Sequence, residues 1–358
     1  MAALALREEL EHRGHHVDMM DPYSLCGGHM DEKVGNCYIK CARKAPKLFG
    51  LIYRLGDLYR RLPFKSPVYW VNRRMAGRMG QYLEAHSYDL IITTHIFPGE
   101  ILAYMRKKGA VLPKVLYIST DYTCIPFTEE TECDYYLVPQ RTREEFCRRG
   151  IPSDRVIPIG IPVRPGFRKE MGREKAVESL GLDPGKRYIL MAGGSIGAGK
   201  ILRAVGIVRE YLSRQKDTVL IVVAGSNVRL HEKLRERYGE DRQILLVGRT
   251  ECMAEYMKAC ELYISKPGGI SSTEAAVSNT PLIHISPIPG CETRNERFFA
   301  GLGMSLYVPH LRKGLVHAME QLEDDNVVNR MKTAQRENID PLAAEKTAAF
   351  AERILKLE

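Results

Sequence analysis

The stretch that decides the fold is Ser265-Lys266-Pro267-Gly268-Gly269-Ile270-Ser271-Ser272-Thr273-Glu274-Ala275-Ala276. The residues ahead of it, 261–264, are predicted to form a short buried strand, and a helix is predicted to open over 274–278. Two glycines in the turn let the backbone come close to a ligand. The hydroxyls of residues 271–273 follow, where a helix presents unpaired N–H groups and positive dipole. This combination predicts an anion-binding site.

A helix cap is the alternative explanation of the same residues. Ser271 and Glu274 stand three apart, the spacing of a capping box, which needs no ligand. The chain continues with a second predicted strand over 282–285 and a second polar loop over 287–295. Two such loops at neighbouring strand ends favour a site for a sugar nucleotide over two isolated caps.

The two loops resemble a known family. Residues 266–275 read K-P-G-G-x-x-S-x-E-A, and residues 289–295 read P-G-x-E-x-x-N. This pattern is similar to the nucleotide-sugar half of glycosyltransferase family 28, in particular to the diacylglycerol glucosyltransferases and monogalactosyldiacylglycerol synthases. The resemblance implies two doubly wound, Rossmann-like α/β domains of the GT-B type. It also implies inverting transfer of a hexose from a UDP-sugar to a membrane lipid acceptor such as diacylglycerol, in glycolipid biosynthesis.

The resemblance also assigns donor-binding roles. Glu274 would accept hydrogen bonds from the ribose hydroxyls, and Glu292 and Asn295 would contact the sugar hydroxyls. Helix N–H groups near 271–273 would stabilise the leaving UDP without a metal, and the chain has no D-x-D motif. The UDP-sugar is a substrate, and no cofactor is expected. The other expected donor contacts are Gly193, Gly194 and Ser195 near the diphosphate, Gly248, Arg249 and Met253 around the uracil, and Lys266, Gly268, Gly269, Ser271, Ser272 and Thr273 in the first loop.

Length and composition fit a two-domain α/β protein. The chain has 358 residues, 44% of them apolar, which is enough for two cores. No apolar run approaches the roughly 18 residues of a membrane span, and no basic-then-apolar signal opens the chain. Nine cysteines are scattered without a C-x-x-C pair. We therefore expect reduced thiols, a cytoplasmic location and no structural zinc site.

Positive charge is concentrated in one segment. The net charge is +9, and residues 38–80 hold eleven Lys or Arg against one acid, Asp57. The same segment holds seven aromatic residues, including Trp70, the only tryptophan. Such a patch suits nucleic acid, an anionic membrane or an acidic substrate. No nucleic-acid-reading motif accompanies the charge, so nucleic acid is the least favoured partner.

A helix is predicted inside this segment, because the apolar residues of 47–62 recur with a helical period. One interpretation is a solvated helix whose apolar side faces the core. The other is an interfacial helix on the inner face of the cell membrane, with apolar side chains in lipid and cations at anionic headgroups. Aromatic residues around Trp70 favour the second. The predicted membrane-binding residues are Lys47, Arg54, Arg61 and Trp70, and Lys40 continues the seven-residue spacing of the cations.

The chain opens on a predicted helix, 2–13, followed by a predicted strand, His15–Met20. In the resembled family, a strand and a G-G-G-H loop precede this helix, so the first strand of the N-terminal domain is absent here. Either the protein has lost it, or the chain was started at an internal methionine. The second is favoured, because losing a central strand would expose strand edges. We expect the chain as given to be a poor catalyst.

Two titratable residues follow adjacent predicted strands. His95 ends the strand 88–95, and Asp121 follows the strand 114–120. The C-terminal ends of parallel strands are where α/β sites collect. Inverting transfer needs a base within about 3 Å of the acceptor hydroxyl. His95 and Asp121 are the catalytic candidates for that role, with neither ranked above the other.

Alternating strands and helices continue to the end of the chain and imply a second doubly wound parallel sheet. A Pro- and Gly-rich segment, 160–167, resembles the family's hinge. We predict an N-terminal acceptor and membrane-binding domain over 1–163 and a C-terminal UDP-sugar-binding domain over 164–340. The helix in 341–358 is expected to pack back on the first domain.

Two other functions remain open at this point. A UDP-sugar-binding peripheral membrane protein without catalytic activity would keep both donor loops. A UDP-sugar 2-epimerase shares the two-domain architecture but consumes no acceptor.

Overall fold

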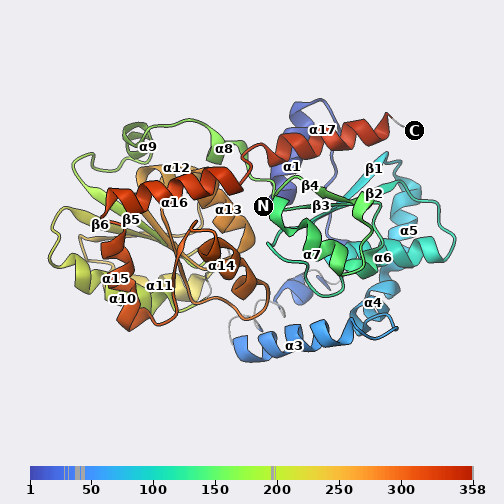
Figure 1. Ribbon diagram of the computed structural model, residues 1–358, viewed down its shortest axis with the longest axis horizontal. Coiled ribbons are helices and arrows are strands. Elements are labelled where there is room, and N and C mark those ends of the chain that lie inside the picture. Colours follow the sequence, from blue (N-terminus) through green and yellow to red (C-terminus); the bar gives the residue numbers. More distant parts are fainter. Residues whose placement is uncertain are drawn as a thin grey trace. The chain divides into compact units, whose positions relative to one another are not determined.

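The computed structural model describes residues 1–27, 29–30, 32–36, 41, 45–194, 197 and 199–356 (Figure 1). The predicted donor residue Ser195, the residue Lys40 and the side chain of Lys47 lie outside the described residues. Backbone contacts divide the chain into two compact units. Unit 1 comprises Met1–Arg164, Pro289–Cys291 and Asp340–Glu358, and unit 2 comprises Pro165–Ile288 and Glu292–Ile339.

Unit 2 is built on a parallel sheet of six strands in the order β10-β9-β8-β5-β6-β7. The first strand in sequence, β5, lies in the middle between β6 and β8, so the winding direction reverses there. This is the doubly wound arrangement that the sequence predicts. The strands are β5 (Arg187–Ala192), β6 (Thr218–Val223), β7 (Ile244–Val247), β8 (Leu262–Ser265), β9 (Leu282–Ile285) and β10 (Leu306–Val308).

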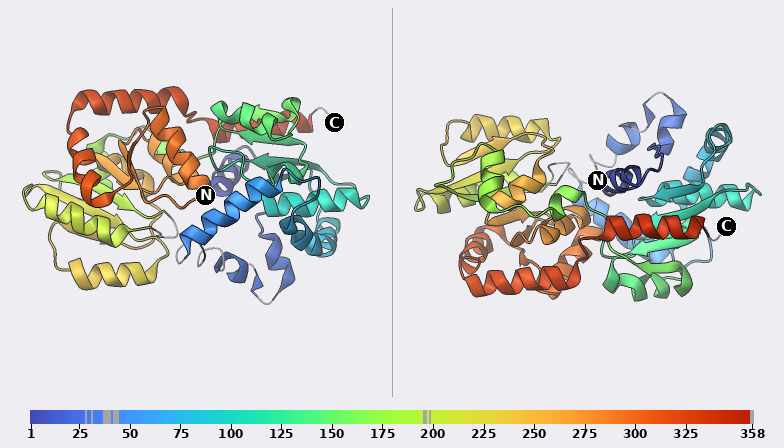
Figure 2. Two further views of the ribbon diagram at one scale, coloured as in Figure 1. Left: turned by 60° about the horizontal axis from the view of Figure 1, so that its bottom comes forward. Right: turned by 90° about the horizontal axis from the view of Figure 1, so that it is seen from above.

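Helices cover both faces of this sheet (Figure 2). Strands such as β6, with the sequence Thr-Val-Leu-Ile-Val-Val, are apolar on both faces, as a sheet between two helix layers requires. One face packs against α10, α11 and α15, and α12 and α13 pack on the other. The helices are α8 (Pro165–Arg168), α9 (Arg173–Ser179), α10 (Ile201–Leu212), α11 (Val228–Tyr238), α12 (Met253–Ala259), α13 (Gly269–Val277), α14 (Cys291–Gly301), α15 (Leu311–Gln321) and α16 (Asp325–Asn338).

Unit 1 has a parallel sheet of four strands in the order β1-β2-β3-β4, which is also their order along the chain. Alternate residues of β2 point to opposite faces, Tyr117 into one apolar core and Leu116 into the other. The first core is closed by α5 and α6, the second by α1 and α17. The strands are β1 (Leu90–Thr93), β2 (Lys114–Ile118), β3 (Tyr135–Val138) and β4 (Val156–Pro158).

Helix α17 lies along α1, so the last helix of the chain packs against the first (Figure 1). The α-helices of unit 1 are α1 (Ala2–His12), α3 (Pro46–Tyr59), α4 (Pro67–Asn72), α5 (Ala76–Ala85), α6 (Ile96–Lys107), α7 (Arg143–Arg148) and α17 (Ala343–Leu355). The short 3-10 helices are η1 (Pro22–Cys26), η2 (Arg73–Met75), η3 (Thr128–Thr131), η4 (Gln140–Thr142) and η5 (Ser153–Arg155).

The predicted strand His15–Met20 is wrong, because these residues form no strand. A strand needs a hydrogen-bonded neighbour. The natural neighbour, β1, pairs with β2 on one side and with no strand of the described chain on the other. A cavity of about 1020 Å³ lies between them, lined by residues 15–23 on one side and 86–95 on the other.

Candidate functional site

The glycine loop after β5 and the loop after β8 meet at the reversal point of the unit 2 sheet. Gly194 and Gly199 have positive φ angles of +68° and +96°, which glycine adopts without strain. The aliphatic part of Lys266 lies beside both. A Cβ atom at Gly199 would stand 3.3 Å from Cδ of Lys266, and one at Gly194 would stand 3.9 Å from Cε. The structure thus brings Gly193, Gly194 and Lys266 together at the place where open α/β sheets bind ligands.

Helix α13 begins at Gly269, five residues earlier than the sequence analysis predicts. Its N-cap is Gly268, and no side chain of the described residues caps the helix, so the capping-box explanation of Ser271 and Glu274 is wrong. Ser272 N–H is the first to bond back, to the carbonyl of Gly268 at 2.9 Å. The backbone N–H groups of residues 269–271 therefore have no acceptor within the described part of the chain. They form an anion-binding start of a nine-residue helix.

Two of the three hydroxyls predicted to face the donor point into unit 2 instead. Ser272 is buried, and its Oγ lies 3.0 Å from Nε2 of His284. Thr273 is buried and donates to the carbonyl of Gly269 at 2.7 Å. We therefore correct the donor role expected of these two hydroxyls, because both are buried and make hydrogen bonds within unit 2. Ser271 is half-buried and keeps its place in the first turn.

His284 holds α13 against the sheet. Its Nε2 faces Ser272, and its Nδ1 lies 3.1 Å from Oγ of Ser305, so both ring nitrogens have partners. Complete burial lowers the pKa of His284 to about 3 and keeps the ring neutral. The sequence analysis missed this link, because its three members lie far apart along the chain.

Lys266 and Glu292 form a buried ion pair in unit 2. The Lys266 Nζ donates to Oε1 of Glu292 at 2.7 Å, and the N–H of Ile288 donates to Oε2 at 2.7 Å. Asn295 is fully buried and donates from Nδ2 to the carbonyl of Pro267 at 3.1 Å. These contacts tie the two predicted donor loops to each other. A carboxylate keeps further lone pairs, so Glu292 can still accept from a sugar hydroxyl.

The remaining predicted donor residues lie after β7 and β8, at the C-terminal ends of the strands of unit 2. Glu274 lies in the second turn of α13 and is 8% exposed. Gly248 and Arg249 follow β7, and Met253 is the first residue of α12. The strand order places β5 and β6 between β7 and β8. The Arg249 side chain is exposed and lies 3.6 Å from Glu251.

His95 and Asp121 follow adjacent strands of unit 1, as predicted. The register pairs Thr93 at the end of β1 with Tyr117 in β2, so both residues lie at the same sheet edge. His95 is the N-cap of α6, and its Nδ1 accepts the N–H of Phe97 at 3.3 Å. This contact assigns the proton of a neutral ring to Nε2, which makes that nitrogen a donor. Asp121 is half-buried.

Helix α3 presents its leucines to solvent. Leu58 is 61% exposed and Phe64, just beyond the helix, is 67% exposed. The interpretation that places the apolar side of this helix in the core is therefore wrong. The exposed apolar residues are Leu48, Leu51, Ile52, Leu55, Leu58, Leu62 and Phe64. We call them the leucine face.

The cationic residues predicted beside the leucine face are also exposed. Arg54 and Arg61 lie at the surface, as does Trp70 in α4. The Arg73 guanidinium stands 4.4 Å from the centre of the Trp70 ring, a cation–π contact. None of the helices that the structure describes is long and apolar enough to cross a bilayer. Nor do the described residues contain three His, Cys, Asp or Glu grouped to hold a metal ion.

Two family models match the chain. Residues 1–163 match monogalactosyldiacylglycerol (MGDG) synthase, and residues 188–353 match the glycosyltransferase family 28 C-terminal domain. A processive diacylglycerol beta-glucosyltransferase of Bacillus subtilis is 28% identical over 95% of this chain and 87% of its own length. The enzyme of the same name from Staphylococcus carnosus is 27% identical over 68% of this chain and 61% of its own length.

Solved structures show the same fold. The S. aureus MnaA–UDP co-structure has a TM-score of 0.63 at 13% identity and covers 82% of this chain and 84% of its own. Acinetobacter baumannii MurG has a TM-score of 0.56 at 15% identity, covering 79% and 78%. These likenesses confirm the predicted GT-B type of fold, with two parallel-sheet α/β domains. The chain therefore belongs to glycosyltransferase family 28, its first part to the MGDG synthase group and its second part to the family's C-terminal domain.

Proposed function

We propose that this protein transfers a hexose from a UDP-sugar to a membrane lipid such as diacylglycerol, with inversion at the anomeric carbon and without a metal. Family membership of both parts of the chain supports the reaction class. The acceptor class follows from the names of the relatives, processive diacylglycerol beta-glucosyltransferases. The observation that carries the donor assignment is the uncapped start of α13 beside the Lys266–Glu292 pair.

The donor chemistry follows from these groups. The N–H groups of residues 269–271, which have no acceptor in the described part of the chain, would bind the diphosphate and stabilise the charge that develops on the leaving UDP. Glu274 would accept from the ribose hydroxyls, and Glu292 would contact the sugar. The sugar contact expected of Asn295 is not proposed, because this residue is fully buried and bonded to the carbonyl of Pro267. Lys266 adds a positive charge, but its pairing with Glu292 holds it as an orienting group. Residues 248–253 would border the uracil ring.

The acceptor hydroxyl must lose a proton as the new glycosidic bond forms. Asp121 is the better base, because His95 uses its Nδ1 as a hydrogen-bond acceptor and carries its proton on Nε2. In this arrangement His95 would donate a hydrogen bond to the acceptor or to the departing charge.

The lipid acceptor would be reached at a membrane surface. The leucine face would enter the interfacial region, and Arg54, Arg61 and Trp70 would lie at the headgroups. Lys47 would extend this cationic rim. We infer peripheral attachment to the inner, cytoplasmic face of an anionic cell membrane.

The test is product formation. Purified protein is incubated with UDP-glucose, UDP-galactose or UDP-N-acetylglucosamine and with liposomes that contain diacylglycerol, and lipid and nucleotide products are separated. Formation of a glycolipid with release of UDP supports the proposal. An epimerised UDP-sugar without glycolipid, or tight UDP binding without any product, contradicts it. Asp121→Asn should lower turnover by about 10²–10⁴-fold, the range for losing a positioned base.

A further inference from the structure

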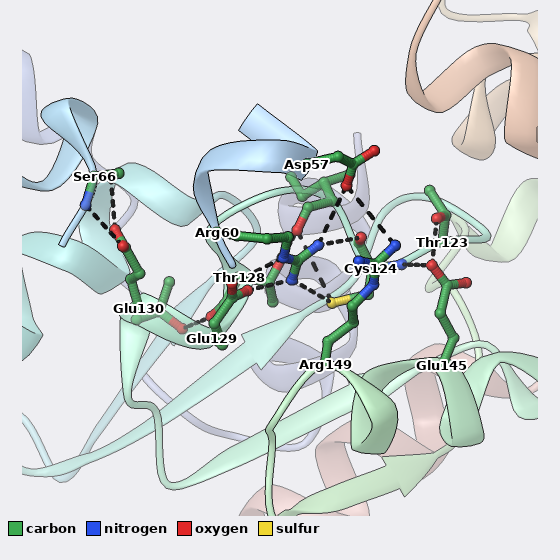
Figure 3. A network of polar contacts seen from close by, with 12 residues as sticks. Asp57, Arg60, Ser66, Thr123, Cys124, Thr128, Glu129, Glu130, Glu145 and Arg149 are labelled. Atoms are coloured by element: carbon green, nitrogen blue, oxygen red, sulfur yellow. Dashed lines mark hydrogen bonds and ion pairs between the residues drawn. The ribbon is translucent and has the colours of Figure 1, made fainter. Parts of the chain in front are cut away.

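A buried guanidinium ties the end of α3 to the loop that follows Asp121 (Figure 3). The Arg60 side chain is 3% exposed although neighbouring residues of the helix lie at the surface. Its Nε donates to Oε1 of Glu129 at 2.9 Å, and a second N–H donates to Oε2. Its Nη1 also donates to the carbonyl of Cys124 at 3.3 Å. One side chain thus contacts both ends of the segment 124–129.

The same segment is held from its other side by α7. The Glu145 Oε1 accepts from the hydroxyl of Thr123 at 2.8 Å and from the N–H of Cys124 at 3.2 Å (Figure 3). Asp57, one turn before Arg60 in α3, lies 3.6 Å from Arg60 and 3.8 Å from Arg149 beyond α7. The backbone of Cys124 is therefore fixed between the arginine that caps the C-terminus of α3 and a glutamate of α7.

A second contact joins this loop to the start of α4. Glu130 accepts from the N–H of Ser66 at 2.8 Å and from its hydroxyl at 2.6 Å, and all of these groups are buried. Ser66 is also the N-cap of α4. Glu129 and Glu130, adjacent in sequence, therefore bind the end of α3 and the beginning of α4.

The loop needs such support, because its backbone is strained. Phe127 and Glu132 adopt positive φ angles of +71° and +45°, although neither is glycine. Residues in this region keep their conformation only where surrounding contacts impose it. Arg60, Ser66 and Glu145 supply part of this support. The two strained residues are also contacted directly, Phe127 by the ring of Tyr59 and Glu132 by Lys65 and Arg106.

We propose that Arg60 is a positioning residue that couples docking of α3 on a bilayer to the conformation of the loop 123–132, and through it to Asp121. Arg60 is the C-cap residue of α3, the helix that carries most of the leucine face, so a bilayer that immobilises this helix also restrains the guanidinium. The proposal rests on the proposed function, which supplies the bilayer and the role of Asp121. Without a bilayer, α3 moves more freely and the strained loop is held less firmly.

Hydrogen exchange of residues 123–132 tests the coupling. Liposomes of phosphatidylglycerol with diacylglycerol should slow exchange in this loop by roughly tenfold in the natural protein. In Arg60→Met the liposomes should not slow it. Turnover should fall by roughly 10²-fold, because a displaced catalytic group costs that much, while liposome flotation and UDP affinity stay as they were. Arg78→Met, an exposed arginine of α5, removes the same charge and should behave as the natural protein.

Further variants keep the test valid where Arg60→Met fails to fold. Arg60→Lys preserves the charge but cannot span Glu129 and Cys124 together, so it should give an intermediate loss of loop protection and turnover. Glu129→Gln should act in the same direction. Equal slowing of exchange in the natural protein and in Arg60→Lys and Glu129→Gln would overturn the proposal.

The proposal and the proposed function fail in different ways. Flotation without any change in loop exchange refutes the coupling and leaves membrane attachment intact. Loss of flotation in the natural protein refutes membrane attachment and the coupling together. Absence of glycolipid, with normal flotation and normal loop protection, refutes the reaction but supports the coupling.

Discussion

Helices α13 and α3 differ in which of their groups are buried and which are exposed. In unit 2, α13 buries the hydroxyls of Ser272 and Thr273, and the N–H groups of residues 269–271 have no acceptor among the residues that the structure describes. In unit 1, α3 presents its leucines to solvent, and the side chain of its C-cap residue, Arg60, is buried. The first arrangement suits a small anion that binds to fixed dipoles. The second suits an apolar medium that covers a whole helix face.

The two sheets differ in a related way. In unit 2 the first strand, β5, has a neighbour on each side, and the reversal beside it gathers the donor groups. In unit 1 the strands run in chain order, and β1 borders a cavity of about 1020 Å³ on its free side. In unit 2 the polar side chains of Lys266, Glu292 and Asn295 already have partners inside the fold, and backbone N–H groups are left for a ligand. In unit 1 a large cavity and an exposed helix face are left instead.

Breaking the ion pair of unit 2 should have the largest effect. Lys266→Met leaves Glu292 buried without its cation, and we expect a loss of about 3–5 kcal/mol in the free energy of unfolding of unit 2. Urea unfolding followed by circular dichroism measures it. Trp70, the only tryptophan, lies in unit 1, so its fluorescence transition is the internal control and should stay in place. The double variant Lys266→Met with Glu292→Gln should regain part of the loss.

Removing the leucine face should affect binding but not folding. Leu51, Leu55 and Leu58 are each about half exposed, so each change to serine removes about 1 kcal/mol of insertion energy. The triple variant should bind liposomes roughly 10²-fold more weakly, with an unchanged unfolding midpoint. A lowered midpoint would show that these leucines pack inside the protein.

The matched comparison is Arg54→Gln with Arg61→Gln, which removes charge from the same helix. Each cation is worth about 1 kcal/mol near an anionic surface. This variant should therefore lose less binding than the leucine variant, and only towards anionic liposomes. Equal loss on neutral liposomes would contradict an electrostatic role for the two arginines.

Changing the ribose contact should have a smaller effect. Glu274→Gln should weaken UDP binding by about 1–3 kcal/mol, the range for a charge-assisted hydrogen bond. Calorimetry with UDP measures it. An unchanged UDP affinity with a lower melting temperature would mean that Glu274 serves α13 and not the nucleotide.

The two units should lose stability in different pH ranges. Burial lowers the pKa of His284 in unit 2 to about 3, so unit 2 loses stability as pH falls from about 6.5 towards 3. Burial raises the pKa of Glu100 in unit 1 to about 8, so unit 1 loses stability as pH rises from about 4.5 to 8. Each slope is at most about 1.4 kcal/mol per pH unit. Burial also lowers the pKa of His95 in unit 1 to about 4, which opposes the Glu100 trend below pH 6.5. Urea unfolding followed by circular dichroism should therefore show the loss of unit 2 below pH 6.5, and Trp70 fluorescence should show the loss of unit 1 between pH 6.5 and 8.

Strand positions in unit 2 were predictable because each is an apolar run bounded by turn residues, and such runs are buried on both faces. The start of α13 was not, because Gly269 reads as a turn residue although its backbone is helical. The strand His15–Met20 fails for a different reason. Its sequence is suited to a strand, but a strand exists only with a partner, and no strand of the described chain pairs with it.

Periodicity also predicted α3 without telling which way its apolar side faces. A stripe of leucines has the same spacing whether it meets a core or a membrane. The orientation could have been predicted from the side opposite the leucine face, where Gly56 and Arg60 lie one helical turn apart. Glycine on the inner side permits close packing, and a Cβ atom at Gly56 would lie 3.1 Å from Cβ of Pro126. The sequence analysis counts Arg60 among the eleven cations of residues 38–80 and therefore does not predict that its side chain is buried.

Because α3 exposes its apolar side, it also changes which substitutions this protein tolerates. In most helices the leucines resist substitution and the outer positions drift freely. A screen for cellular abundance would find the reverse on α3, with polar residues accepted at Leu51, Leu55 and Leu58 and rejected at Gly56. A screen for glycolipid production would restore the usual ranking. Selection for abundance and selection for lipid synthesis therefore act on different stripes of the same fourteen-residue helix.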